Sequence, residues 1–400
     1  MPPSQRVRLL VRHLREFGWE PVIFTVDQYY REELSDPWMV EITGNAFEQL
    51  TVKAWDQRRS RKIGIGDLGI RIFFHLFNAM RKEAKKRRPA LILYPVPPWY
   101  IMVMAPLLKR LTGIPYAIDF IDPWIFELKK KNTKARFSQW IARRLEGYVM
   151  RPSSAIFAVS QGILNDLKKR YPKIQERPLI AVPYGVEASD FISINKGKEQ
   201  GPKVILRYTG AVSGNMLPVI ETLFKALKIV HAKIPLLVIF TGTSYAGKGM
   251  VIPILQELIN KQDMSQIVVE NPSRVSYREA LELNMGADLQ LLIGDTTPYY
   301  AASKLMGMVA SGQPFFAFVN TNSFPANFLA DLDFADTVCF LPDHLDSDAT
   351  VEALANALLK AIENRDHFIP VEKENPVFLQ HTAKAMTKIF TDTFQKIAHE

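Results

Sequence analysis

Lys304 follows a run of small residues and precedes a short apolar segment, a spacing that suits phosphate binding. The segment 305–309 predicts a helix with one apolar face, and Ser303 is its expected N-cap. Ser311-Gly312 should end this helix, because glycine adopts the left-handed cap conformation at little cost. Amide groups at a helix start attract an anion, and the lysine would add a positive charge. An ordinary loop–helix–strand unit with a solvated lysine fits these residues equally well, so both interpretations stay open.

Two carboxylates stand where the strand predicted over 115–120 ends. Asp119 and Asp122 lie at the end of the strand expected over 115–120. In parallel sheets this end of a strand commonly carries functional groups, so both residues are candidates for a catalytic role. The alternative is that Asp122 caps a helix beginning at Pro123, and the sequence does not decide between them.

Two glycine motifs resemble nucleotide-binding loops only in part. Residues 64–69 fit the pattern GxGxxG, but they follow a charged segment, and no acidic residue ends the next strand. Residues 242–248 resemble a P-loop, although Gly249 occupies the position of the magnesium-binding Ser or Thr. We therefore interpret Gly242 as part of a glycine-rich turn that lines a nucleotide cleft through its backbone. The histidines are scattered and show no metal-ligand spacing, so no metal site is predicted.

Composition favours a soluble two-domain protein. The chain has 400 residues, with 48% hydrophobic and 23% charged residues. Its single cysteine, Cys339, excludes an internal disulfide framework and indicates a reducing compartment. Residues 90–108 are uncharged but interrupted by four prolines, which favours a strand and a helix over a membrane span. No signal peptide is apparent, so we expect a cytoplasmic protein, either free or peripheral at the inner face of the membrane.

Charge is distributed unevenly along the chain. Residues 1–151 carry 27 Lys and Arg against 15 Asp and Glu, a net charge of +12, and the remainder carries 23 against 26, or −3. The basic half contains the runs 82–88 and 128–134 and the pair Arg143-Arg144. Each run alone is typical of a solvated helix face. Together they favour an anionic partner, either acidic lipid headgroups or a phosphorylated acceptor. Nucleic acid is not expected, because no recognition motif accompanies the basic residues.

Alternation of strands and helices predicts an α/β fold. In the first half, 27–66 is expected to be irregular, and the pattern lacks the first strand of the domain. A polar linker is expected over 189–201, followed by a second α/β series. Two parallel sheets covered on both faces would result, with ligands at the carboxyl ends of their strands. The predicted strands are 21–26, 91–94, 115–120, 155–160, 179–185, 203–210, 236–242, 266–270, 288–293, 315–319 and 337–341, and the predicted helices are 6–17, 70–86, 100–111, 136–151, 161–171, 217–231, 250–262, 277–286, 349–364 and 376–399.

The expected domain organisation has three parts. Residues 1–188 form an N-terminal Rossmann-like domain and 202–370 a C-terminal one. A final helix, 376–400, carries enough apolar residues to pack back onto the N-terminal domain.

Several stretches, taken in order, resemble the GT-B nucleotide-sugar glycosyltransferases of the retaining family-4 type. They are PPSQRVRLLVRHLREFGWEPVIFTV, DFIDPW, AIFAVSQGILNDLKKRYP, VPYGVEASDF, YTGAVSGN, and SYREALELNMGADLQLLI followed by SKLMGMVASGQPFFAF. The resemblance covers nearly the whole chain and implies two Rossmann-like domains facing a cleft, the first on the acceptor side and the second on the donor side. It also implies transfer of a sugar from a nucleoside diphosphate sugar without a metal or another cofactor. The acceptor would be a glycan or a lipid-linked molecule in surface glycan or polysaccharide synthesis.

The resemblance also implies a set of donor-site positions. The diphosphate would be held by Lys304, the amides near Ser303 and the Thr209-Gly210 loop. Gly242 and Leu305 are further expected donor-site positions. Several positions depart from the family pattern, among them Tyr299, which stands where a longer Glu-x7-Glu pattern would place its first glutamate. Gly307 stands where a glutamate normally binds the ribose, Asn215 or Met216 replaces an arginine, and Ile121 replaces another arginine in DFIDPW.

Two other functions remain as alternatives. A non-catalytic sugar-nucleotide-binding or partner subunit would keep the fold and lose the chemistry, and Gly307 and Asn215 favour it. A nucleotide-sugar epimerase of the same fold is less favoured, because no paired catalytic carboxylates with a histidine are found.

Overall fold

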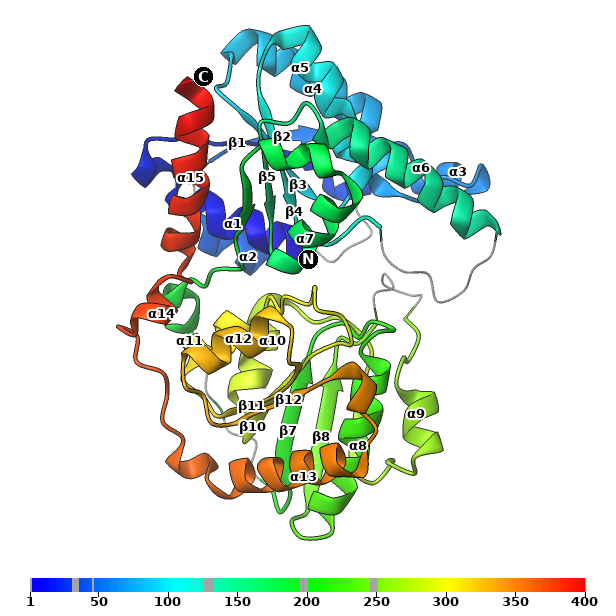
Figure 1. Ribbon diagram of the computed structural model, residues 1–400, viewed down its shortest axis with the longest axis vertical. Helices are drawn as coiled ribbons and strands as arrows, with labels where there is room; N and C mark the ends of the chain where they lie inside the picture. The colour runs from blue at the N-terminus through cyan, green and yellow to red at the C-terminus, as the bar shows by residue number, and fades with distance from the viewer. Residues whose placement is uncertain are drawn as a thin grey trace. The chain divides into compact units, whose positions relative to one another are not determined.

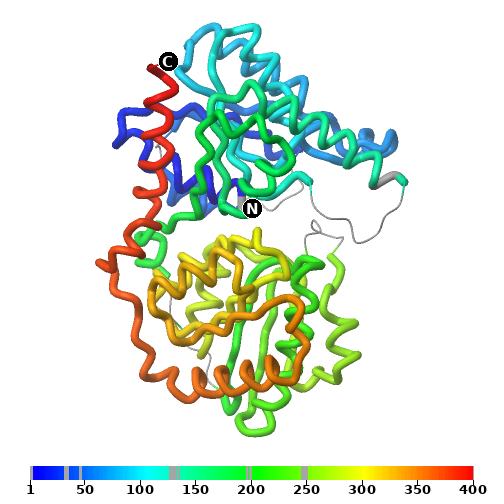
Figure 2. The backbone as a smooth tube through the Cα atoms, viewed as in Figure 1, coloured from blue at the N-terminus to red at the C-terminus, as the bar shows by residue number. Residues whose placement is uncertain are grey.

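The computed structural model describes residues 2–30, 36–44, 47–125, 133–194, 197, 201–244 and 251–399. Within this part, the chain divides into two compact units. Unit 1 comprises Met1–Arg31, Thr43–Gly185 and Ala383–Glu400, and unit 2 comprises Glu32–Ile42 and Val186–Thr382. Figure 1 shows the elements of each unit, and Figure 2 traces the same path as a tube.

Unit 1 is built on parallel strands. Four of them pair in the order β3-β4-β5-β6, and β1 pairs with β2 in a separate two-stranded sheet. The bounds of these strands are β1 (Val22–Val26), β2 (Glu48–Val52), β3 (Ile92–Val96), β4 (Tyr116–Phe120), β5 (Ala155–Ala158) and β6 (Leu179–Ala181). The helices are α1 (Pro2–Leu14), α3 (Gln57–Lys62), α4 (Leu68–Arg87), α5 (Ala105–Thr112), α6 (Thr133–Met150), α7 (Gln161–Arg170) and α15 (Ala383–His399).

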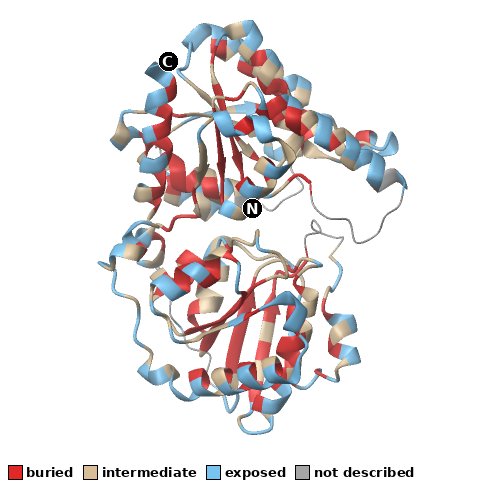
Figure 3. Cartoon of the chain, viewed as in Figure 1, coloured by how far each residue is buried: buried red, intermediate tan, exposed pale blue. Residues whose placement is uncertain are grey.

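The central strands of unit 1 are fully buried and consist mostly of apolar residues, with Asp119 of β4 as the charged exception. Every residue of β4 and β5 is buried, and Figure 3 shows these strands in the buried colour. Such continuous burial is typical of parallel sheets with helices on both sides. The long helix α4 begins where the Asp67 side chain accepts the amide of Ile70.

The last helix of the chain packs against the first. Leu10 and Leu14 of α1 share an apolar cluster with Met386, Phe390 and Phe394 of α15. The single helix expected over 376–399 is wrong, because the chain forms two helices there. α14 (Pro376–Leu379) belongs to unit 2, and α15 begins only at Ala383 in unit 1.

Unit 2 contains one parallel sheet with the strand order β12-β11-β10-β7-β8-β9. Its helices lie on both faces (Figure 1), and two separate apolar clusters fill the space between them and the sheet. The strands are β7 (Val204–Thr209), β8 (Leu236–Thr241), β9 (Val268–Asn271), β10 (Leu289–Ile293), β11 (Phe315–Asn320) and β12 (Thr337–Phe340). The helices are α2 (Pro37–Thr43, assigned to this unit up to Ile42), α8 (Leu217–His231), α9 (Gln256–Lys261), α10 (Tyr277–Met285), α11 (Leu305–Ser311), α12 (Phe324–Asp331), α13 (Asp348–Glu363) and α14.

Short 3-10 helices connect several of these elements. They are η1 (Arg15–Phe17), η2 (Gln28–Tyr30), η3 (Trp99–Met104), η4 (Pro172–Glu176), η5 (Ala188–Phe191), η6 (Pro342–His344) and η7 (Arg365–His367).

The segment predicted to be irregular, 27–66, contains regular elements. β2 lies within it, as do α2 and α3. α2 packs on unit 2, where the Asp36 carboxylate accepts the amide of Tyr277 at 2.6 Å and the Trp38 ring lies 5.6 Å from that of Tyr277. These elements were missed because they are short and β2 buries only Val52, which leaves no periodic apolar pattern to detect.

Candidate functional site

The candidate site is at the carboxyl ends of the central strands of unit 2. β7 and β10 are neighbours, and the chain proceeds from β7 to β8 and β9 on one side and from β10 to β11 and β12 on the other. The loops that follow β7 and β10 therefore lead away in opposite directions. α/β proteins bind their ligands at such a switch in strand order.

Lys304 connects the two sides of this switch. Its ammonium group donates to the carbonyl oxygen of Thr209, the last residue of β7, at 3.1 Å. The same nitrogen lies 3.2 Å from the centroid of the buried Tyr208 ring, a cation–π contact. Among the residues that the structure describes, no carboxylate is paired with Lys304. The Lys304 amino group is thus held at the strand ends by neutral groups alone.

Burial of the ammonium group lowers the pKa of Lys304 well below its ordinary value. The charged ammonium form loses its hydration there, and no carboxylate of the described residues compensates for that loss. An anion bound at this nitrogen would raise the pKa again, so anion binding and protonation of Lys304 are coupled.

Two glycines let the backbone pass close to this lysine. Gly210 has a φ of 141° and Gly242 a φ of 79°, both in the region that favours glycine. A Cβ atom at Gly210 would come within 3.5 Å of the Lys304 nitrogen, and one at Gly242 within 3.9 Å of the Gly210 amide nitrogen. The structure therefore brings together Thr209, Gly210, Gly242 and Lys304, four of the positions predicted for the donor site.

The adjoining loops are tied to one another by hydrogen bonds. The Thr209 hydroxyl donates to Asn284 Oδ1 at 2.7 Å, which connects β7 to α10. The carbonyl oxygen of Asn215 accepts the amide of Thr296 at 3.3 Å, which connects the loop after β7 to the loop after β10. Asn215 thus contributes its backbone to the shape of this edge.

The remaining predicted positions lie at the start of α11, and two expectations about them change. Ser303 is exposed and is not the N-cap, because the helix begins one residue later and Lys304 is in the cap position without a side-chain cap. Leu305 is fully buried in an apolar cluster, and its amide already donates to the Ala302 carbonyl at 3.1 Å. The expected left-handed C-cap at Gly312 is confirmed, with a φ of 61°.

Gly307 leaves limited room for a larger residue. A Cβ atom at this position would lie 3.4 Å from Cζ of Phe191 in η5. A side chain there would require a small shift of the Phe191 ring.

Asp119 in unit 1 is engaged in a buried ion pair. Its two carboxylate oxygens accept from Nε and Nη2 of Arg6 at 2.9 and 3.0 Å, and both side chains are 1% exposed. The third guanidinium nitrogen donates to the carbonyl oxygen of Pro183 at 2.9 Å. This arrangement fixes α1 to the ends of β4 and β6, which is a structural task.

Asp122 differs from Asp119 in its surroundings. The residue is exposed, but partial burial of its carboxyl group raises the pKa of Asp122, and its carbonyl oxygen accepts the indole N–H of Trp99 at 3.3 Å. Residues 121–125 form bends, so the described residues show no helix starting at Pro123 for Asp122 to cap. Asp122 therefore remains available to a ligand on unit 1.

Sequence reasoning missed Arg6, Tyr208 and Asp295. Arg6 carries no local signal, because its partner Asp119 lies 113 positions away. Asp295 follows β10 and accepts both the amide and the hydroxyl of Thr297 at 2.7 Å. Its position directly after a buried strand is the same signal that singled out Asp119.

Two other predicted features have structural explanations or lie outside the described residues. In the GxGxxG segment, Gly69 is inside α4, where a Cβ atom would come within 3.0 Å of Pro98 Cβ. Lys248 of the P-loop-like segment lies outside the described residues, as does most of the basic run 128–134. Within the described part of the chain, no group of three or more His, Cys, Asp or Glu side chains is placed to hold a metal ion.

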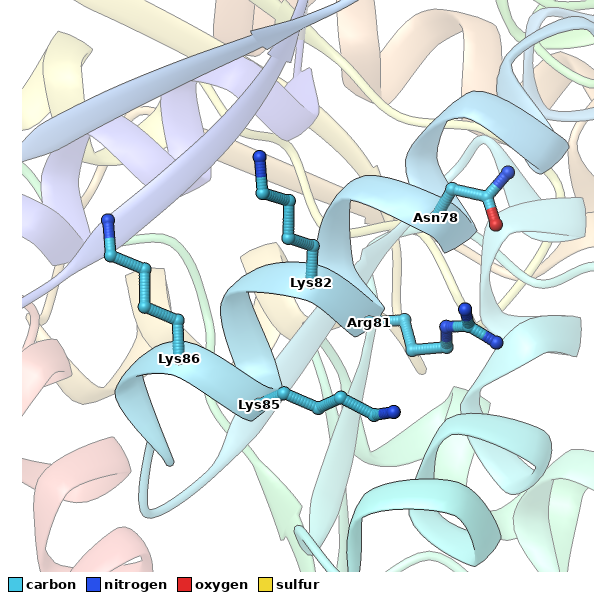
Figure 4. Close-up of a pocket in the computed structure, with 5 residues that line it drawn as sticks. All are labelled: Asn78, Arg81, Lys82, Lys85 and Lys86. Atoms are coloured by element: carbon cyan, nitrogen blue, oxygen red, sulfur yellow. The ribbon is translucent and has the colours of Figure 1, made fainter.

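A basic surface hollow of about 620 Å³ lies on α4 in unit 1. Figure 4 shows Lys82 and Lys86 extending in one direction and Arg81 and Lys85 in another. Arg87 is not part of it, because its guanidinium is paired with the Glu48 carboxylate at 2.6 Å. The run 82–88 therefore presents several lysines to solvent.

Comparisons with known proteins agree with this architecture. Residues 3–185 match the family described as Glycosyl transferase 4-like domain. A search of curated protein sequences finds no match to the chain. None of the helices in the described residues is long and apolar enough to cross a membrane.

Solved structures share the fold over almost the full chain. A sucrose-phosphate synthase from Thermosynechococcus elongatus has a TM-score of 0.66 at 12% identity, with 98% of this chain and 92% of that chain covered. An α,α-trehalose-phosphate synthase from Burkholderia vietnamiensis has a TM-score of 0.59 at 10% identity, with 94% of each chain covered. A putative UDP-N-acetylglucosamine 2-epimerase from Listeria monocytogenes has a TM-score of 0.51 at 11% identity, covering 97% and 92%. The chain therefore has the α/β fold of GT-B glycosyltransferase structures, a fold that an epimerase shares.

Proposed function

We propose that this protein is a glycosyltransferase that moves a sugar from a nucleoside diphosphate sugar to an acceptor. The observation that carries the proposal is the Lys304 ammonium group, which is held against Thr209 and Tyr208 at the switch in strand order, with no carboxylate partner among the described residues. A diphosphate is the ligand whose charge and size suit such a group. The match of residues 3–185 to a glycosyltransferase domain supports the same conclusion.

Each candidate residue has a role in this proposal. Lys304 binds the diphosphate and stabilises the negative charge that develops on it as the sugar leaves. Gly210 and Gly242 let the backbone approach the phosphates, because neither carries a Cβ atom that would block the approach. Transfer uses no metal ion, since the lysine ammonium group neutralises the leaving group, and the resemblance to retaining family-4 enzymes favours retention of the sugar's configuration.

On unit 1, we assign Asp122 to the acceptor side and Asp119 to the scaffold. Asp122 is exposed and follows β4, whereas both Asp119 oxygens are bonded to Arg6. The acceptor is a glycan or a lipid-linked molecule, reached by a cytoplasmic protein that binds an anionic membrane surface through unit 1. The exposed basic residues of α4 favour such a surface.

A second candidate is a sugar-nucleotide-binding subunit without transferase activity. Gly307 favours it, because this position offers no carboxylate for a ribose, and a Cβ atom added there would lie 3.4 Å from the Phe191 ring.

Nucleotide binding and turnover separate these candidates. The purified chain is incubated with a panel of nucleoside diphosphate sugars, and its melting temperature and the release of nucleoside diphosphate are measured. A transferase is stabilised by one nucleoside diphosphate and slowly releases it from the matching sugar nucleotide even with water as acceptor. Stabilisation without release indicates the non-catalytic subunit. If no nucleotide changes the melting temperature, both candidates are wrong.

A further inference from the structure

Helix α6 presents an exposed ladder of two aromatic rings and a guanidinium group. Phe137 and Trp140 are 61% and 54% exposed. Their rings stack with centroids 6.0 Å apart and an interplanar angle of 15°. The guanidinium carbon of Arg144 lies 5.0 Å from the centroid of the Trp140 ring. The spacing of three and four residues places all three side chains on one face of the helix.

We propose that this face of α6 inserts into the membrane that unit 1 binds, in addition to the basic residues of α4, and that it binds anionic lipid. Phe137 and Trp140 enter the interfacial layer of the bilayer, and Arg144 binds lipid phosphate groups. Tryptophan is favoured at this depth, because its ring is amphipathic. An exposed apolar stripe rimmed by cations is the pattern of a helix that lies in the interface.

The charge of α6 favours an anionic surface over a neutral one. Arg136, Arg143 and Arg144 are exposed along the helix. Its single carboxylate, Glu146, is fully buried and lies 3.2 Å from Arg170 of α7. No exposed acidic side chain of α6 therefore opposes its arginines. Each arginine near an anionic membrane surface contributes about 1 kcal/mol, equivalent to roughly fivefold in binding.

The neighbouring helix carries the same chemistry. α5 packs against α6 and exposes Leu107 and Leu111, which are 43% and 48% exposed. Arg110 is exposed between them. Two adjacent helices of unit 1 thus present apolar and cationic side chains to solvent. Nucleic acid is less well suited to this surface, because a base stacking on Trp140 would have to displace Phe137 or Arg144 from its ring.

The inference rests on the proposed function in one respect: a membrane-held acceptor is the reason for the protein to bind a membrane. Its test does not require transferase activity. Vesicles of phosphatidylcholine with about one third phosphatidylglycerol are sedimented with wild-type protein and with two variants. One is the double variant Phe137→Ala/Trp140→Ala, and the other is Arg144→Gln.

The expected losses of vesicle affinity are about tenfold or more for the double variant and about fivefold for Arg144→Gln. Tyr29→Ala is the aromatic control, because Tyr29 is 79% exposed in unit 1 and belongs to η2 rather than to α6. Lys228→Gln is the charge control, because Lys228 is exposed on α8 of unit 2. Both controls should bind vesicles as well as wild type does. All variants replace exposed side chains, and unchanged melting temperatures verify that they are folded.

Fluorescence quenching locates the contact directly. Vesicles that contain brominated lipid chains should quench the tryptophan emission of the wild type. Trp140→Phe, which keeps an aromatic ring, should still bind and should lose most of this quenching. Equal vesicle binding by the double variant, or unchanged quenching in Trp140→Phe, would overturn the proposal. So would a wild type that binds a single-stranded oligonucleotide but no anionic vesicles. Nucleotide titration of the same samples reports on the proposed function separately.

Discussion

Asp119 shows how one carboxylate at a strand end becomes part of the scaffold. Because Arg6 occupies both of its oxygens in a fully buried setting, removing either partner leaves an uncompensated charge. We expect Asp119→Asn to lower the free energy of unfolding by about 3–5 kcal/mol, measured by urea denaturation. Arg6→Met should cost a similar amount, and the double variant less than the two losses together. Full stability of Asp119→Asn would return this residue to the catalytic candidates.

Glu146 makes stability depend on pH. Burial raises the pKa of Glu146 to about 7, although Arg170 opposes the shift. Its ordinary value is 4.5, so between pH 4.5 and 7 the folded state binds a proton that the unfolded state does not. The free energy of unfolding should therefore fall as pH rises through this window, by on the order of 2–3 kcal/mol.

The matched variant is Glu146→Gln, which keeps the shape of the side chain and leaves Arg170 its ion pair with Asp166. It should flatten the decline and be more stable than wild type above pH 7. Parallel stability profiles for the two proteins from pH 4.5 to 8 would contradict this account.

At the scale of elements, the start of α4 depends on a glycine for packing rather than for nucleotide binding. A Cβ atom at Gly69 would come within 3.0 Å of Pro98 Cβ and of the Asp67 oxygen that caps the helix. Gly69→Ala should lower the free energy of unfolding by about 1–3 kcal/mol. Gly66→Ala is the control, because nothing lies within 4 Å of its added Cβ atom. A stability loss shared equally by both variants would rule out the contact with Pro98 and the Asp67 cap as the cause.

Most elements were predictable because their sequences carry strong local patterns. β4 and β11 are mostly apolar runs, in which Asp119 and Asn320 are the polar residues, and α4 combines an N-cap with long helical periodicity. β2 was missed because only one of its residues is buried, and its pairing with β1 uses backbone groups. α12 was missed because it is eight residues long and its N-cap side chain makes no capping hydrogen bond.

In the candidate site too, residues with a local sequence pattern could be predicted and contacts between distant residues could not. Lys304 and Gly210 could be singled out because they adjoin strand ends and turns. The burial of the Lys304 ammonium group against Tyr208 could not, since it depends on residues far apart in the chain that only the folded sheet brings together. Arg6 was missed for the same reason, because an arginine at the start of an amphipathic helix is usually solvated.

At the scale of the whole molecule, the chain passes between the two units more than once. α15 returns to unit 1 after α14 of unit 2, and residues 32–42 belong to unit 2 although the segments on both sides belong to unit 1. Two ends of the unit 2 segment, Val186 and Thr382, lie side by side. The Val186 amide donates to the His381 carbonyl at 2.9 Å, and Val186 forms a β-bridge with Thr382. The apolar residues of the last helix indicated its return to the N-terminal unit, whereas nothing in the local sequence of 36–42 predicts its place in unit 2.

The most direct test of the proposed function is calorimetric titration of nucleoside diphosphates into wild type, Lys304→Met and Lys228→Met. Lys304→Met removes a charge-assisted hydrogen bond to the diphosphate, so its affinity should fall about ten- to a hundredfold. The unliganded variant should be at least as stable as wild type, because it no longer buries an ammonium group. Lys228→Met should bind as wild type does, since Lys228 is an exposed lysine of α8. Equal affinity of Lys304→Met and wild type would contradict the assignment of the donor site.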